Sequence, residues 1–239
     1  MKKLLKFLGE ALFPEDFTCE ICGTETFGSH LCPRCEKGVV LNNGNVCPVC
    51  GRKNAIPEIC TECKAEAPLF EKAVSAFVYE GCGTALIAKF KNGGAYLKDY
   101  LAMLIAEKLP SLPPIDSIVY VPMTKKARAK REYNQAELLA ESISEKTGIP
   151  VIKDAVIKTK DTSEQKKLSQ TQRAENLKHC FKAEKKDEIK GKSLLLVDDV
   201  LTTGATANAI CKRLYKVGAS HIYFASVASV EYNPKPRKN

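Results

Sequence analysis

The chain has 239 residues, of which 44% are hydrophobic and 27% charged, and its formal net charge is +9 at pH 7. This length suits one α/β domain with a small additional module, and the composition is typical of a globular protein. Because no apolar run approaches the ~20 residues needed to cross a bilayer, a membrane-spanning protein is excluded.

The first 17 residues (1–17) predict an amphipathic helix. Basic residues precede an apolar stretch, but Lys6 and Glu10 interrupt it and no small-residue cleavage site follows, so we reject a signal peptide. The apolar residues that share one face of this helix are Leu4, Leu5, Leu8 and Leu12. We expect this face to dock on its own protein in the cytoplasm, with weak contact to the inner-membrane surface as the minority alternative.

Residues 18–68 are rich in cysteine. Eight cysteines form four C-x-x-C pairs with gaps of 9, 11 and 9 residues: Cys19/Cys22, Cys32/Cys35, Cys47/Cys50 and Cys60/Cys63. Two such pairs supply the four thiolates that structural Zn²⁺ prefers, and without a secretion signal we favour metal over disulfides. The pattern predicts a double zinc ribbon with two Zn²⁺ sites. The equal outer gaps favour sequential sites, and an interleaved pairing is the alternative.

Charge divides unevenly along the chain. Residues 1–70 carry 8 Lys+Arg and 9 Asp+Glu, whereas residues 71–239 carry 29 and 19. A zinc ribbon that grips a nucleic-acid backbone is usually basic. We therefore expect this ribbon to contact protein, either a partner or its own neighbouring domain.

The second predicted domain spans residues 71–232 and begins with strands and helices in turn. The apolar segment from Glu71 predicts a strand, and residues 85–109 predict two helices broken at Gly93-Gly94. Ser117 begins the next strand, which ends near a proline. A basic tail, residues 233–239, is expected to be disordered.

A basic run follows that strand, with five positive charges in seven residues: Lys125, Lys126, Arg128, Lys130 and Arg131. A helix is predicted after it, with Leu138, Leu139 and Ile143 facing inward and a stop at Gly148. Taken alone, the run is either a solvated start of this helix or a site for an anion.

A polar segment follows the short strand predicted at residues 155–159. It has no apolar anchors, which is typical of a disordered loop or a functional lid. Its cationic and amide residues are Lys158, Lys160, Gln165, Lys166, Lys167 and Arg173.

The stretch LLLVDDVLTTGAT, residues 194–206, predicts a buried parallel strand, a loop and a helix. Asp198 and Asp199 are expected at the carboxyl end of the strand, where ligands of parallel sheets collect. The loop places N–H groups and hydroxyls at a helix N-terminus, which favours a phosphate. A phosphorylated ribose suits both features, with its phosphate in the loop and its hydroxyls on the acids. The plainer alternative is a strand that ends in two solvated aspartates before a capped helix.

Those 13 residues resemble the phosphoribosyl pyrophosphate (PRPP) signature of type I phosphoribosyltransferases. Together with the cysteine module, the chain resembles the ComF family along nearly its whole length. The residues that carry this resemblance are Phe13-Pro14, Cys47-Pro48-Val49-Cys50-Gly51, Tyr79-Glu80-Gly81, Ile87 to Lys91, Val121-Pro122, Tyr133-Asn134-Gln135, the spaced Gln165, Leu168, Arg173, Asn176 and Phe181, and the acid-pair loop. The implied fold is α/β, a Rossmann-like parallel sheet flanked by helices, with a small N-terminal zinc-ribbon module.

The resemblance also implies roles for individual residues. Asp198 and Asp199 would fix the ribose of PRPP, which binds with Mg²⁺. The 5′-phosphate loop would be Thr202, Thr203, Gly204, Ala205 and Thr206. The pyrophosphate and lid residues would be Lys125, Arg128, Arg131, Gln165 and Arg173. Apart from the resemblance, the basic face itself is a candidate contact for nucleic acid, through Lys126, Lys130 and Tyr133, the clear aromatic for base stacking.

One position departs from the family pattern. Members usually have glycine after the arginine that precedes the aromatic-Asn-Gln motif, and here Glu132 follows Arg131. If that glycine adopts a left-handed or close-approach conformation, Glu132 strains the loop or places a negative charge near the pyrophosphate.

The resemblance implies a protein of natural transformation that handles incoming single-stranded DNA. Its zinc module would contact proteins of the DNA-uptake machinery, and its second domain would bind PRPP and transfer the phosphoribosyl group to an acceptor that the sequence does not identify. Two alternatives are a PRPP-dependent base-salvage transferase and a non-catalytic module that binds nucleic acid or senses PRPP.

Overall fold

The computed structural model describes residues 18–26, 28–159 and 180–231. The predicted helix over residues 1–17, the lid residues Gln165 and Arg173, and the tail over residues 233–239 lie outside the described residues. In the described part of the chain, no helix is both long and apolar enough to span a membrane.

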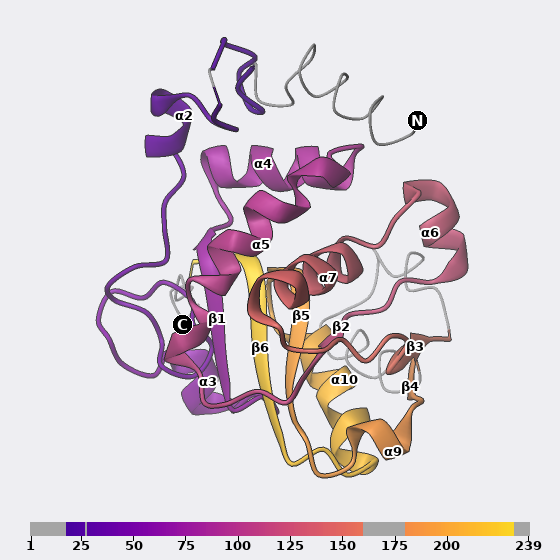
Figure 1. Cartoon of the computed structure of the whole chain (residues 1–239). Coiled ribbons are helices and arrows are strands. Elements are labelled where there is room, and N and C mark those ends of the chain that lie inside the picture. The colour runs from indigo at the N-terminus through magenta and orange to yellow at the C-terminus, as the bar shows by residue number, and fades with distance from the viewer. Residues whose placement is uncertain (1–17, 27, 160–179, 232–239) are drawn as a thin grey trace, which may run out of the picture.

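A four-stranded parallel sheet forms the centre of the molecule (Figure 1). Its strands, in spatial order, are β1 (Lys72–Val78), β6 (His221–Ser229), β5 (Ser193–Leu201) and β2 (Ser117–Tyr120). Of the two central strands, β6 is buried at every position after its first and β5 is buried from Leu194 to Val197, as expected of strands that are covered on both faces. A separate antiparallel pair joins β3 (Val156–Lys158) to β4 (Phe181–Ala183). The predicted parallel α/β fold is confirmed.

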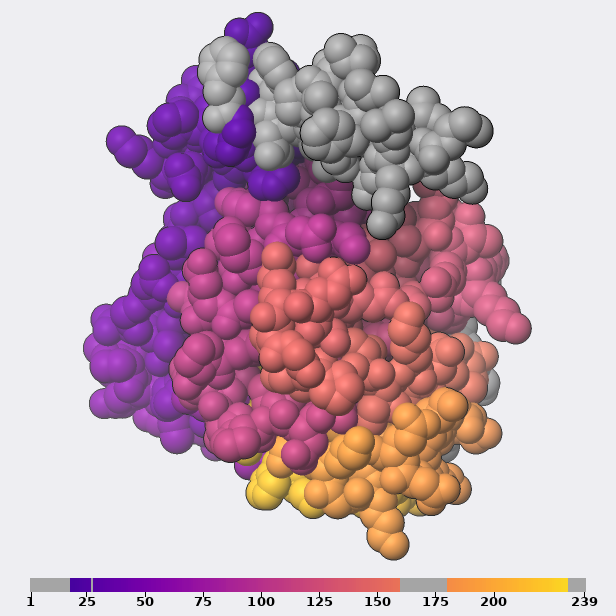
Figure 2. Space-filling view, in the orientation of Figure 1, coloured from indigo at the N-terminus to yellow at the C-terminus, as the bar shows by residue number. Residues whose placement is uncertain are grey.

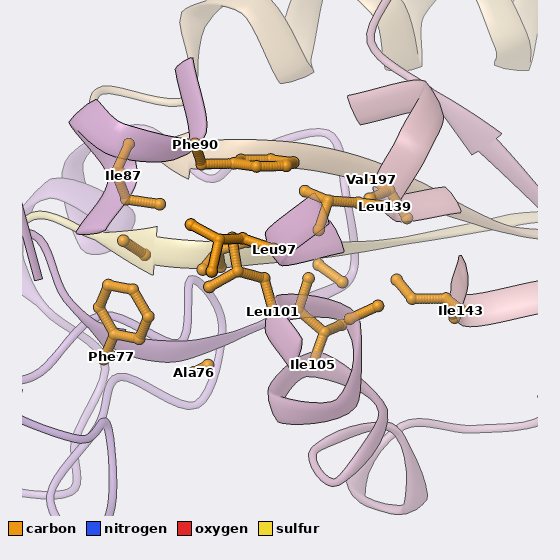
Figure 3. Packing of buried hydrophobic residues seen from close by; sticks show 14 of the residues in the cluster. Ala76, Phe77, Ile87, Phe90, Leu97, Leu101, Ile105, Leu139, Ile143 and Val197 are labelled. Carbon is orange, nitrogen blue, oxygen red and sulfur yellow. The ribbon is translucent and has the colours of Figure 1, made fainter. Parts of the chain in front are cut away.

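Helices cover both faces of the sheet, and alternate residues of β5 point to opposite layers. Leu195 and Val197 belong to one core cluster, and Leu194 and Leu196 belong to the other. The first layer contains α4 (Gly81–Lys91), α5 (Lys98–Ala106) and α7 (Gln135–Thr147), whose apolar side chains are shown in Figure 3. The second contains α9 (Lys186–Ile189) and α10 (Ala205–Lys216). Short 3₁₀ turns, η1 (Ala95–Leu97) and η2 (Leu109–Ser111), flank α5.

Two local predictions were wrong. β5 does not end at the acid pair but continues to Leu201, because its register with β6 extends to Ser229. On its other side the ladder with β2 stops at Val197, so the acids lie inside the strand yet beyond the end of its neighbour. The basic run is not the start of α7, which was one alternative, but a separate short helix, α6 (Lys125–Arg131), and the Thr124 hydroxyl caps it by accepting the Ala127 N–H.

The cysteine-rich segment lies along the free edge of β1, and Figure 2 shows it as a band down one side of the molecule. The amides of Asn42 and Val78 bond to the carbonyls of Ala76 and Val40, at 2.9 and 2.8 Å, and Leu41 bridges Phe77 in antiparallel register. Of the two expected protein contacts, the structure therefore contains the one with the chain's own domain. The segment also satisfies backbone groups that an open sheet edge would expose.

Candidate active site and metal centres

The eight paired cysteines gather into two clusters, Cys19/Cys22/Cys32/Cys35 and Cys47/Cys50/Cys60/Cys63. Within each cluster the sulfur atoms lie within 4.8 Å of one another. Four thiolates about 2.3 Å from one Zn²⁺ ion at tetrahedral angles stand about 3.8 Å apart. The sulfur atoms of Cys22 and Cys32 are 3.6 Å apart, and those of Cys50 and Cys60 are 3.8 Å apart, so the donor sets fit zinc. The sequential pairing is confirmed, and the interleaved one is excluded.

Each cluster is built from the same two pieces of local structure. A tight turn carries the first pair, closed by an amide-to-carbonyl bond from Gly23 to Cys19 in one cluster and from Gly51 to Cys47 in the other. Both glycines have positive φ, +71° and +66°, which lets the chain reverse around the metal position. The second pair opens a one-turn helix, α2 (Pro33–Lys37) or α3 (Thr61–Ala65).

The main cavity of the site, about 910 Å³, opens beyond the end of β2, beside the acid pair of β5. Its walls come from the end of α4, the segment after β2, the helix α6 and Lys158 of β3. Segments far apart in the sequence thus meet at the carboxyl side of a parallel sheet, which is where such folds bind ligands.

Asp198 and Asp199 line this cavity. Asp199 donates its backbone N–H to the Asp198 carboxylate at 2.8 Å, and its own carboxylate pairs with Lys91 at 2.9 Å. Desolvation by the surrounding protein, reinforced by the adjacent Asp199 charge, raises the pKa of Asp198 to about 8. Without a ligand, Asp198 thus keeps its proton at neutral pH and Lys91 offsets the charge of Asp199. A cation or hydroxyl donors bound at the pair would favour the ionised form of Asp198.

Lys91 is a site residue that charge patterning did not identify. It lies at the end of α4 within the stretch Ile87 to Lys91 that carried the family resemblance, and its side chain reaches across the cavity to β5. Nothing in the local sequence distinguishes it from Lys89, which instead pairs with Glu20 of the cysteine-rich segment.

The basic helix α6 contributes three cations to the cavity wall: Lys126, Lys130 and Arg131. Of the residues predicted to hold pyrophosphate, Arg131 is therefore in place, whereas Lys125 and Arg128 are absent from the described lining. Arg128 instead pairs with Glu137 at 2.9 Å. Lys126 and Lys130 had been assigned to nucleic acid, and the structure puts them beside Arg131.

Glu132 also lines the cavity, and its backbone is in the region that favours glycine, with φ +68° and ψ −32°. Residues other than Gly, Asn and Asp rarely adopt this backbone conformation, which costs them on the order of 1–3 kcal/mol. Both expected consequences of having Glu132 in place of the family's glycine are thus present. The backbone is locally strained, and a negative charge lies at the cavity.

The predicted 5′-phosphate loop follows β5 directly. Gly204, with φ +76°, is the N-cap of α10, so this helix begins at Ala205. The Thr203 hydroxyl accepts the Ala205 N–H at 3.4 Å. The loop residues do not line the main cavity in the described chain. Thr203 and Gly204 line a second cavity of about 250 Å³, which they share with Arg52 of the cysteine-rich segment.

Tyr133 has structural contacts that its assignment to base stacking did not anticipate. Its hydroxyl donates to the Phe90 carbonyl at 2.5 Å and accepts the Gly93 N–H at 3.2 Å. Asn134 next to it caps α7 and donates to the Val121 carbonyl at 3.0 Å. These bonds hold the α4 turn and the segment after β2 at the cavity, so both residues shape its walls.

A parallel α/β sheet with an acid pair and a phosphate-type loop, joined to two four-cysteine centres, defines a phosphoribosyltransferase-type domain with a double zinc ribbon. Sequence comparison agrees, since residues 8–64 match the family described as "Double zinc ribbon domain" and residues 133–239 match "Phosphoribosyl transferase domain". The chain is 33% identical over 201 residues to "Competence protein F" of Haemophilus influenzae, covering 80% of this chain and 87% of that protein. The chain belongs to the ComF family.

Two further relatives extend this result. "Competence protein ComFC" of Bacillus subtilis is 25% identical over 236 residues, which cover 95% of this chain and 93% of the relative. "DNA utilization protein YhgH" of Salmonella typhi is 28% identical over 214 residues, which cover 85% and 93%. The similarity therefore spans the zinc ribbon and the transferase domain together.

Proposed function

We propose that the main cavity binds PRPP and that the protein acts on incoming DNA during natural transformation. The observation that carries the PRPP site is that two groups of opposite charge line one cavity, the acid pair of β5 and the cations of α6. PRPP has the matching arrangement, with ribose hydroxyls in its middle and a pyrophosphate at C1.

The acid pair binds the ribose of PRPP in this proposal. Asp198 and Asp199 accept hydrogen bonds from the 2′- and 3′-hydroxyls, and the loop from Thr202 to Thr206 holds the 5′-phosphate at the N-terminus of α10. This loop directly follows β5, so a ribose on the acids has its 5′ side toward it. Lys91 keeps the acid pair from repelling the phosphates, because it neutralises Asp199.

The cations of α6 bind the pyrophosphate of PRPP in this proposal. The cations that line the same cavity as the acids are Lys126, Lys130 and Arg131, and Lys158 adds a fourth positive charge. The proposed set of pyrophosphate-binding residues is completed by longer-range or lid residues, which are Lys125, Arg128, Gln165 and Arg173. Mg²⁺, when bound with PRPP, supplies further neutralisation of the pyrophosphate.

Transfer would break the bond between C1 and the pyrophosphate oxygen, and pyrophosphate would leave with the electron pair as an acceptor bonds to C1. Positive charge develops on the ribose ring in such a displacement, and the nearby Asp198 and Asp199 carboxylates stabilise it. The cations of α6 stabilise the negative charge that accumulates on the leaving group.

The names of the relatives support the DNA role. Two are competence proteins and one is a DNA utilization protein, and their similarity to this chain includes the cysteine-rich segment. We infer that residues 18–68 form the ribbon and residues 71–232 the transferase domain. We place the protein in the cytoplasm, where PRPP is available, with single-stranded DNA and proteins of the uptake machinery as its partners.

Calorimetry with PRPP and Mg²⁺ tests the site. Wild type is expected to bind with micromolar affinity, and Asp198→Asn/Asp199→Asn is expected to lose at least about tenfold, because two charged acceptors are replaced. Asp187→Asn/Glu188→Gln is a matched control, since it alters an exposed adjacent acid pair on α9 and should bind normally. No binding by folded, zinc-loaded wild type would refute the PRPP site.

Glu132 favours a second candidate function, PRPP-regulated binding of nucleic acid without transfer. Its strained backbone and its charge at the cavity wall both oppose tight binding of a leaving group. In this case single-stranded DNA binds α6 in a salt-sensitive manner and PRPP displaces it. Release of pyrophosphate during DNA binding would instead indicate transfer.

A further inference from the structure

Arg52 is a buried arginine whose three donor groups point to three different parts of the molecule. Only 6% of its surface is exposed. Its Nε donates to the Cys50 sulfur at 3.3 Å, its Nη2 to the Glu62 carboxylate at 2.6 Å, and its Nη1 to the Thr202 carbonyl at 3.3 Å. A side chain of the second zinc centre is thereby bonded to the first residue of the 5′-phosphate loop.

The turn that carries Arg52 is attached firmly to the sheet. The Ala73 amide of β1 donates to the Val49 carbonyl at 2.8 Å, and Arg52 accepts the Cys47 N–H through its own carbonyl at 2.9 Å. Gly51 approaches β1 so closely that a Cβ there would lie 2.3 Å from the Ala73 carbonyl oxygen. The guanidinium is therefore held in place from the backbone and, through Cys50, from the metal position.

The bond to Thr202 sets the direction of a peptide group in the loop. In a trans peptide the C=O and the following N–H point in opposite directions, and no cis peptide is present in the described chain. Because the Thr202 carbonyl points to Arg52, the Thr203 N–H points away from the zinc ribbon. An N–H fixed in this direction is a donor ready for a phosphate on the other side of the loop.

We propose that Arg52 is a positioning residue for the 5′-phosphate loop, and that the second zinc centre is through it a structural part of the ribose-phosphate site. This inference rests on the proposed PRPP site. The first zinc centre provides the contrast, because Arg34, the arginine beside Cys22, is exposed and, in the described chain, does not bond to this loop.

Ligand fragments separate positioning of the loop from a general loss of stability. Ribose 5-phosphate uses the acid pair and the loop, whereas inorganic pyrophosphate uses α6. Arg52→Ala is expected to weaken ribose 5-phosphate binding about tenfold and pyrophosphate binding less than about twofold. Hydrogen exchange at the Thr203 and Gly204 amides should become faster in the same variant, because the Thr202 carbonyl loses its partner.

Further variants keep the test decisive if Arg52→Ala folds poorly. Arg52→Lys keeps a positive charge beside the thiolates but cannot reach three acceptors, so it should retain two zinc ions per chain and still lose ribose 5-phosphate affinity. Arg34→Ala is the matched control and should bind both fragments normally. Cys63→Ser should lose one zinc and ribose 5-phosphate binding together, and Cys22→Ser should lose one zinc without this effect.

The outcomes distinguish this inference from the proposed function. If wild type binds ribose 5-phosphate and both Arg52 variants bind it equally well, the positioning role is overturned and the PRPP site stands. Equal weakening of both fragments would also overturn it, because it would show a general loss of structure. If wild type binds neither fragment nor PRPP, both proposals fall.

Discussion

The cysteine-rich segment and the transferase domain differ in where they place backbone conformations with positive φ. In the described part of residues 18–68 these conformations occur only at glycine, for example Gly23 and Gly51. In the described part of residues 71–231 they also occur at Glu132, Asp154 and Lys185. The ribbon is thus locally relaxed, whereas the sheet domain tolerates strain, including strain at its cavity.

This difference predicts that replacing a glycine of the ribbon lowers the free energy of unfolding, whereas introducing a glycine at a strained residue of the sheet domain raises it. The largest effect is expected in the second zinc turn. Gly51→Ala should lower the free energy of unfolding by about 3 kcal/mol or more, because its Cβ would overlap the Ala73 carbonyl and its φ is positive. Denaturant unfolding and zinc content would measure the change.

Gly23→Ala is the matched control in the first zinc turn. Its φ is also positive, but nothing lies within 4 Å of the added Cβ, so a loss of about 1 kcal/mol is expected. Equal losses in the two variants would contradict the closer attachment of the second turn to β1.

A smaller effect, opposite in sign, is expected at the acid pair. The pKa of Asp198 is raised to about 8 from the ordinary 3.8, so between these pH values the folded state keeps a proton that the unfolded state releases. This group therefore lowers stability as pH rises through that window. Asp198→Asn should be more stable than wild type at pH 8.5 without ligand, and this advantage should shrink as pH falls toward 4.

Urea unfolding across this pH range measures the difference. Asp187→Asn, at an exposed position of α9, should leave the pH profile of wild type unchanged. A constant difference between Asp198→Asn and wild type at every pH would show that the Asp198 carboxyl titrates normally.

The smallest effect is expected at Glu132. Glu132→Gly should raise the free energy of unfolding by about 1 kcal/mol, because relief of the positive φ outweighs the entropy that glycine adds to the unfolded chain. Both this variant and Glu132→Gln remove a negative charge from the cavity, so each should bind PRPP about threefold more tightly.

Glu132→Gln keeps the strained backbone, and its stability should equal that of wild type. Parallel thermal unfolding and PRPP titration of the two variants separate strain from charge. A gain of stability in Glu132→Gln would attribute the cost to charge instead.

The zinc centres were predictable from sequence because the requirement is local. Two residues separate the cysteines of each pair, and nine residues separate the two pairs that share one ion. These spacings determine which thiols can come together, and the structure brings together the predicted sets. The acid pair was predictable for a related reason, since an apolar run followed by Asp198 and Asp199 defines a strand and its ligand side.

The parts that sequence did not predict depend on distant contacts. β5 continues to Leu201 because β6 pairs with it there, and no local pattern reports that register. Arg52 and Thr202 are 150 positions apart, so their bond becomes visible only when the ribbon is docked on the sheet. The α6 helix was missed because KKARAKR has no apolar periodicity, and its Thr124 cap is the one local signal.

The zinc ribbon covers the edge of β1, and this has a consequence for folding while the chain is being synthesised. β1 pairs with β6, the last strand of the sheet to leave the ribosome, and nearly the whole transferase domain is made between them. The ribbon precedes β1 in the chain and already offers carbonyls and amides at Val40, Asn42 and Val49. A zinc-loaded ribbon can therefore hold a nascent apolar strand until its partner arrives, so metal supply during translation would decide how much of this protein reaches the folded state.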